Sequence, residues 1–210
     1  MEITMKKLIL LAAVACVAGI TTAHGQKVYK NGNTIVLDLS VAAGMPTGAV
    51  TTAPKVFPAT RPSNSALWSP DNCDGSGYDG PLNKTMYHKL EVAPGHLNTS
   101  GAMDDTGTIA MDWASAVQGC RTSTYDGGGW RAPTSRELRC IFLFREALEA
   151  HGCSPILLYG VGGTYATWSA TEQRLDRAMC MAGDPDNETR QIEGRDKTER
   201  LGVRCVRELP

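Results

Sequence analysis

Residues 127–138 constrain the fold of this chain most, because a tight turn there runs directly into the start of a helix. Three consecutive glycines at residues 127–129 allow backbone angles that other residues resist. The turn that they form delivers the large aromatic ring of Trp130 to a fixed place. Pro133 disfavours helix at the residue before it, so we expect the helix to begin just after this proline.

The helix start itself has a recognisable pattern. Thr134 and Glu137 stand in capping-box spacing, in which each side chain accepts a hydrogen bond from the backbone N–H of the other residue. An apolar run over residues 138–148 follows, and Gly152 suits the end of a helix. We therefore expect a buried helix over residues 135–150.

Residues 1–25 have the pattern of a secretory signal peptide. Lysines 6 and 7 precede an apolar run over residues 8–20, and small residues precede Gln26. This run is too short to span a bilayer comfortably. A lipid anchor on Cys16 is the alternative, which the continuation of the apolar run past that cysteine disfavours. We expect export to the cell surface, fimbriae, extracellular space or periplasm, with no transmembrane span after signal removal.

Six cysteines remain outside this leader, and their even number in an exported chain predicts disulfide bonds, with fifteen pairings allowed. A structural zinc site needs close-paired ligands, and no two of these cysteines are separated by only two to four residues. We therefore expect disulfides, no metal and no other cofactor. The six are Cys73, Cys120, Cys140, Cys153, Cys180 and Cys205. The formal net charge of -1 also argues against nucleic acid as a partner.

The rest of the chain divides into an N-terminal region over residues 26–69 and a domain over residues 70–210. A β-hairpin is expected over residues 28–39, with Asn31-Gly32 as its turn. A Pro/Thr-rich extended arm follows, with an edge strand near residues 55–57. This arm could be disordered, dock on the main domain, or dock on a neighbouring subunit by strand addition.

Within the domain, hydrophobic periodicity predicts one further helix and several strands. Asp112 can cap a helix whose apolar residues recur at helical spacing. We expect this helix over residues 113–119, strands over residues 86–92, 108–111, 165–170, 177–182 and 201–207, and a polar loop over residues 183–197.

Four motifs in a fixed order carry a family resemblance that covers about residues 85–209. They are Trp113-Ala114, then Trp130-Arg131-Ala132-Pro133-Thr134 with Glu137-Leu138, then Trp168-Ser169-Ala170-Thr171-Glu172, then Val203-Arg204-Cys205-Val206-Arg207. Together they resemble a bacterial domain of unknown function named after the C-terminal domain of a Legionella collagen-like adhesin. The variants in fimbrial tip-like and surface proteins of gut bacteria are most similar. The chain departs from the family at Ala132, where Leu is usual.

The resemblance implies an α+β fold similar to C-type-lectin-like domains and to formylglycine-generating enzymes, with two helices flanking small twisted antiparallel sheets. It also implies a disulfide between Cys120 and Cys205. The other four cysteines have no usual counterpart in the family, and their pairing is open. Our working hypothesis joins Cys140 to Cys153 and Cys73 to Cys180.

The motif residues are expected to build the core. Trp113, Trp130 and Trp168 could form a sugar-stacking platform, but their place inside structural motifs favours burial. Arg131, Glu137 and Glu172 are expected to satisfy buried polar groups, because unpaired polar atoms are costly inside a protein. Pro133, Thr134 and Arg204 complete this structural set.

Ligand contacts are expected from the irregular segments. Trp68 and Tyr78 lie in the irregular part, and the loop after residue 183 contributes acidic and amide side chains at Asp184, Asp186, Asn187 and Glu188. This loop lacks the Glu-Pro-Asn and Gln-Pro-Asp triplets of calcium-dependent lectins, so we expect no calcium site there.

A non-enzymatic binding or adhesion domain is the favoured hypothesis, with a glycan or a protein as ligand and fimbrial or surface subunits as partners. The chain has no Gly-x-Ser-x-Gly nucleophile elbow, and its histidines show no metal spacing. The alternatives are an oxidase of the formylglycine-generating type, which requires reactive cysteines, and a purely structural periplasmic protein.

Overall fold

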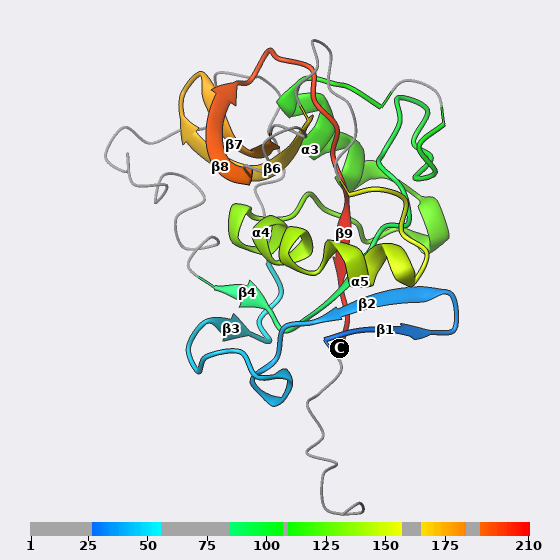
Figure 1. Ribbon diagram of the computed structural model, residues 1–210. Coiled ribbons are helices and arrows are strands. Elements are labelled where there is room, and N and C mark those ends of the chain that lie inside the picture. The colour runs from blue at the N-terminus through cyan, green and yellow to red at the C-terminus, as the bar shows by residue number, and fades with distance from the viewer. Residues whose placement is uncertain (1–26, 56–84, 107–108, 157–164, 184–189) are drawn as a thin grey trace, which may run out of the picture.

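A computed structural model describes residues 27–55, 85–106, 109–156, 165–183 and 190–210. Over these residues the fold is α+β, with helices packed among small sheets (Figure 1). The expected signal peptide lies outside the described residues. In the described part of the chain, no helix combines the length and the apolar character needed to cross a membrane.

The largest sheet joins both ends of the described chain. It contains β1 (Val28–Asn31), β2 (Thr34–Asp38), β5 (Lys89–Val92) and β9 (Val206–Glu208), in that order and all antiparallel. The expected hairpin is confirmed, but the pairing of β1 with β2 places Gly32 and Asn33 in the turn, one residue later than predicted. Since β2 pairs with β5, the hairpin belongs to the domain and is not a separate unit.

The segment after the hairpin is also docked on the domain as far as Lys55. It forms a short 3₁₀ helix, η1 (Val41–Ala43), and strand β3 (Val50–Thr51), which pairs in parallel with β4 (Met86–Tyr87). The edge strand expected near residue 55 therefore lies earlier, and residues 56–57 are outside the described part. Lys55 is held through its backbone N–H by the Glu208 carboxylate at 2.9 Å.

Three α-helices are described. The first is α3 (Trp113–Thr122), capped by Asp112 as expected. The predicted helix over residues 135–150 is instead two helices, α4 (Ser135–Leu143) and α5 (Arg145–Ala150), because Phe144 between them leaves helical geometry at φ -102° and ψ 16°. The capping box at the start of α4 is present.

A three-stranded antiparallel sheet completes the domain. It contains β6 (Tyr165–Arg174), β7 (Arg177–Gly183) and β8 (Arg190–Asp196). The predicted polar loop over residues 183–197 is wrong for the β8 segment, whose polar composition fits a strand at the sheet edge. The predicted last strand is shorter than expected: Leu201 and Gly202 make single bridges to Met111 and Thr167 before β9 begins.

The described core has one cluster around the tryptophans, one between the hairpin and the last two helices, which Figure 1 shows beside each other, and a small one between α4 and β7. Trp113 and Trp168 are fully buried and Trp130 is 2% exposed, so the prediction that all three belong to the core is confirmed. Each indole N–H donates to a backbone carbonyl, at 2.7–3.0 Å. Burial with a satisfied N–H is what a structural tryptophan requires.

Candidate functional site

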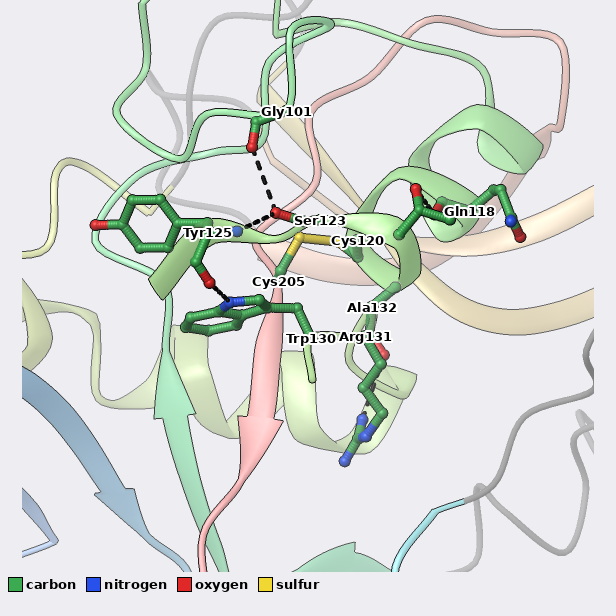
Figure 2. Close-up of a disulfide and its surroundings, with 10 residues drawn as sticks. Gly101, Gln118, Cys120, Ser123, Tyr125, Trp130, Arg131, Ala132 and Cys205 are labelled. Atoms are coloured by element: carbon green, nitrogen blue, oxygen red, sulfur yellow. Dashed lines mark hydrogen bonds between the residues drawn. A yellow bond between two sulfur atoms is a disulfide. The ribbon is translucent and has the colours of Figure 1, made fainter. Parts of the chain in front are cut away.

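The disulfide between Cys120 and Cys205 ties α3 to the segment just before β9 (Figure 2). This pairing confirms the expectation that the family resemblance supplied. Ser123 follows Cys120 by one turn, and its hydroxyl donates to Gly101 O at 3.3 Å and accepts from Tyr125 N–H at 3.2 Å. These two hydrogen bonds fix the loops at Gly101 and Tyr125 beside the bridged end of α3.

The expected bridge between Cys140 and Cys153 is wrong. Both residues are buried thiols: Cys140 Sγ lies 3.1 Å from Met86 Sδ, and Cys153 Sγ lies 3.8 Å from Ala93 O. Nearness in sequence does not bring two Cβ atoms into the narrow geometry that a disulfide needs. Cys180 is a buried thiol as well, and its expected partner Cys73 lies outside the described residues.

Burial makes the three thiols poor nucleophiles. It raises the pKa of Cys140 and Cys153 to about 11 and that of Cys180 to about 12, chiefly because a thiolate loses its hydration in the core. The thiolate is the reactive form, so at neutral pH only a very small fraction of each of these thiols is reactive.

We expect iodoacetamide at pH 8 to label Cys140, Cys153 and Cys180 at least about 100-fold more slowly in the native protein than in guanidinium, since both thiolate fraction and access are reduced. Peptide mass spectrometry after timed quenching measures this. Leu143→Cys is the matched control, because residue 143 lies on the same helix as Cys140 and is 68% exposed. Fast native labelling of any of the three buried thiols contradicts the prediction.

Arg131 and Glu137, both from the motif, form a buried ion pair with Nη1–Oε2 at 2.7 Å, and Arg131 also reaches Glu208 at 3.0 Å. Glu137 accepts from the backbone N–H groups of Thr134 and Tyr87 at 3.0 and 3.1 Å. Burial alone would raise the pKa of Glu137, but the Arg131 guanidinium lowers it overall. These groups hold the turn, α4, β4 and β9 together, which is the structural role that the sequence predicts.

A second buried pair holds the three-stranded sheet against α3. Lys197 Nζ lies 2.6 Å from Glu172 Oε1 and 4.5 Å from the centre of the Trp113 ring. Lys197 also donates to Leu175 O at 3.0 Å. Glu172 therefore has the polar-satisfying role that its motif position predicts.

Arg204 is a further buried charged residue of the motifs. Its guanidinium donates to the carbonyls of Ala93, Pro94 and Pro155 at 2.6–3.0 Å, and one nitrogen lies 3.0 Å from His96 Nδ1. His96 Nδ1 also lies 3.0 Å from the Asp105 carboxylate. Burial, and then the Arg204 charge, lower the pKa of His96 to about 4, so its ring is neutral at pH 7.

This pKa predicts a stability loss in mild acid. An unfolded histidine has a pKa of about 6.5, so unfolding takes up a proton between about pH 6.5 and pH 4. The contribution of His96 is complete above about pH 6.5 and is lost as the pH falls towards 4. We expect the free energy of unfolding to be about 2 kcal/mol lower at pH 5 than at pH 7 from this residue alone.

Urea unfolding at the two pH values measures this difference, with His96→Asn as the comparison. The variant is expected to have a lower free energy of unfolding than wild type at pH 7. Between pH 7 and pH 5, however, this free energy should fall by about 2 kcal/mol less in the variant than in wild type. The other histidines are present in both proteins, so their contributions cancel. An equal pH dependence in wild type and variant contradicts the assignment.

A hollow of about 580 Å³ lies at the surface between α3 and the loop that precedes it. Its helix side is formed by small residues, and its loop side by short polar ones. The residues that define these sides are Ser115, Gly119 and Thr122 on α3, and Asn98, Thr99 and Ser100 on the loop. Leu97 and Met111 are buried beneath, and Asp112 and Arg200 supply charges at the lining.

The loop wall of the hollow is rigidly built. Asn98 is 4% exposed, and its Oδ1 accepts from the N–H groups of Ser100 and Ala102 at 2.9 Å. Its Nδ2 donates to Thr106 O at 2.8 Å. Gly101 adopts φ +89°, a conformation that residues with a Cβ rarely take. The wall therefore keeps its shape without a ligand.

The ligand-contact residues predicted from the sequence all lie outside the described residues. They are Trp68, Tyr78, Asp184, Asp186, Asn187 and Glu188. The hollow was not predicted. The signal for it is the polar face of α3, where Ser115, Gly119 and Thr122 recur at helical spacing on the side away from the core. Among the described residues, no group of three or more His, Cys, Asp or Glu side chains is placed to hold a metal ion.

Fold and site together define a disulfide-bridged α+β domain with a preformed polar hollow. Comparison of the sequence with protein-family models gave no match, and comparison with curated proteins gave none either. The adhesin-like family resemblance therefore stays a prediction.

Proposed function

We propose that this protein is an exported, non-enzymatic binding domain of C-type-lectin-like fold that recognises a glycan or a protein partner in adhesion or surface assembly. The observation that carries the proposal is the hollow beside α3. It presents hydroxyl, amide and backbone groups on a rigid frame, at the size of a small-molecule site. Binding domains commonly place their variable contacts on loops held by such a scaffold.

The chemistry of the described residues supports binding over catalysis. The buried charged side chains of the motifs and of Lys197 make structural contacts: Arg131 with Glu137, Lys197 with Glu172, and Arg204 against backbone carbonyls. None of these residues lines the hollow. The residues that do line it are small and polar, a composition suited to hydrogen bonding with a ligand.

The alternative oxidase needs an accessible pair of thiols with lowered pKa. Cys140, Cys153 and Cys180 are instead buried with raised pKa, and Cys120 and Cys205 are joined. The disulfide also supports export, because such bonds persist mainly in oxidising compartments. The proposed docking of the arm on another subunit receives less support, because β2 and β3 pair with strands of their own chain.

A binding screen with the secreted full chain tests the proposal. The protein is applied to an array of glycans and, separately, to immobilised surface proteins of the same bacterium, with and without calcium. The proposal expects saturable binding to at least one ligand class that survives alkylation with iodoacetamide. Absence of saturable binding on both surfaces, or oxidation of a cysteine-containing peptide by the purified protein, contradicts it.

A further inference from the structure

We infer that the hollow between α3 and the loop at residues 97–101 is a site for a neutral sugar residue, an inference that rests on the proposed binding function. The hollow is lined by residues from three separate stretches: this loop, the exposed face of α3, and Arg200. Its volume of about 580 Å³ lies within the range of about 300–1,000 Å³ that small-molecule sites occupy.

The charges at the hollow give a charged ligand no net attraction. Among its lining residues the ionised side chains are Asp112 and Arg200, one of each sign, so the lining has no net charge. Asp112 is fixed as the cap of α3, with Oδ1 accepting from Ser115 N–H at 2.9 Å and Oδ2 from Ser115 Oγ at 2.9 Å. Arg200 is fixed by donation to Ala110 O at 3.1 Å. An acidic or a basic sugar would be attracted by one of these two charges and repelled by the other, so a charge on the ligand brings no net attraction.

The remaining polar groups match sugar hydroxyls. Thr99, Ser100, Ser115 and Thr122 each bring a hydroxyl, which can donate one hydrogen bond and accept two. A sugar hydroxyl has the same dual capacity. Several of these protein hydroxyls make one local bond, such as Thr122 Oγ1 to Gln118 O at 3.0 Å, and keep acceptor capacity for a ligand.

The lower part of the hollow is apolar and tightly packed. Leu97 and Met111 are 1% and 5% exposed, and a Cβ at Gly119 would come within 2.7 Å of Leu97 Cδ2. Gly119 therefore allows the loop to pack directly against α3 and leaves space above it.

Affinity for a single sugar is expected to be low. No aromatic side chain is among the lining residues of the hollow, so a ring cannot stack there. A surface-displayed domain can compensate by binding several copies of a ligand at once, because multivalency raises avidity without new contacts. The probe must therefore be multivalent.

The experiment uses an array of multivalent neutral glycans, terminated by mannose, galactose or N-acetylglucosamine, and acidic glycans, terminated by sialic or glucuronic acid. Thr122→Tyr fills the hollow from an exposed helix position, and Leu143→Tyr is the control on an exposed helix position outside it. Asp112→Asn removes the negative charge and keeps a good helix cap.

Wild type is expected to bind one or more neutral probes. Thr122→Tyr should lose at least about tenfold in apparent affinity for those probes, and Leu143→Tyr should bind them within about twofold of wild type. Asp112→Asn is expected to raise the binding of acidic probes relative to neutral ones by about fivefold, the effect of removing one exposed like charge while Arg200 remains. Circular dichroism checks that each variant is folded.

The outcomes separate the two proposals. Stronger binding of wild type to acidic than to neutral probes overturns the sugar assignment. Glycan binding that Thr122→Tyr leaves unchanged overturns the location while the binding function stands. Saturable binding to immobilised protein alone, with no glycan bound, overturns the sugar site but keeps the domain a binder. Failure on every surface overturns both.

Discussion

Replacing Cys120 and Cys205 together by alanine should lower the free energy of unfolding by about 4–5 kcal/mol. The disulfide joins residues 85 positions apart in the sequence, and closing a loop of that length removes much of the conformational freedom of the unfolded chain. The chain-entropy relation gives about 4.6 kcal/mol for this loop length. Guanidinium unfolding monitored by tryptophan fluorescence measures the loss as a shift in the transition midpoint.

Cys153→Ala is the control, because Cys153 is also a buried cysteine, at 6% exposed, but carries no bridge. It should cost about 1 kcal/mol, the usual effect of a small core change. Dithiothreitol should destabilise wild type by about as much as the double substitution does and leave the double variant unaffected. A double variant as stable as Cys153→Ala would mean that the bridge does not constrain the unfolded chain.

Local sequence patterns predicted the elements whose geometry depends on neighbours in the chain. The capping box of Thr134 and Glu137, the Asp112 cap and the β1–β2 hairpin all involve residues within a few positions of one another. Their hydrogen bonds follow from residue type and spacing alone. The burial of Trp113, Trp130 and Trp168 was predictable for a related reason, because each ring belongs to a recognisable sequence motif.

The features that were missed depend on contacts distant in sequence. The hairpin joins the domain through the pairing of β2 with β5, more than fifty residues later. Cys140 faces Met86 instead of Cys153, and β8 forms at the edge of a sheet despite its polar composition. None of these has a local signal, because the partner is chosen by packing of the whole domain.

The hollow beside α3 was missed for the same reason. Its walls come from residues near 98, 115 and 200, and each is a small polar or charged residue of the kind found on any surface. Only the fold shows that they share one concave face. The predicted contact residues, in contrast, all lie outside the described residues.

Glu137→Ala should cost about 3–5 kcal/mol of stability, the usual loss when one partner of a buried ion pair is removed. The substitution removes one carboxylate partner of the Arg131 guanidinium, which keeps its contact with Glu208, and removes the acceptors of the Thr134 and Tyr87 N–H groups. Both changes weaken the contacts that hold the N-terminal end of α4 against β4 and the turn before it. Urea unfolding at pH 7 measures the effect.

Two comparisons show whether the buried charge is responsible. Glu146→Ala removes a helix glutamate that is 87% exposed and pairs with Arg145 at the surface, so it should cost less than about 0.5 kcal/mol. Glu137→Gln keeps one side-chain oxygen, which can accept from one of the two backbone N–H groups, and loses the negative charge beside Arg131. If charge compensation dominates, Glu137→Gln should lose at least half of what Glu137→Ala loses. A cost for Glu137→Ala no larger than that of Glu146→Ala would show that hydrophobic packing alone anchors α4, because the ion pair would then contribute no more than an exposed one.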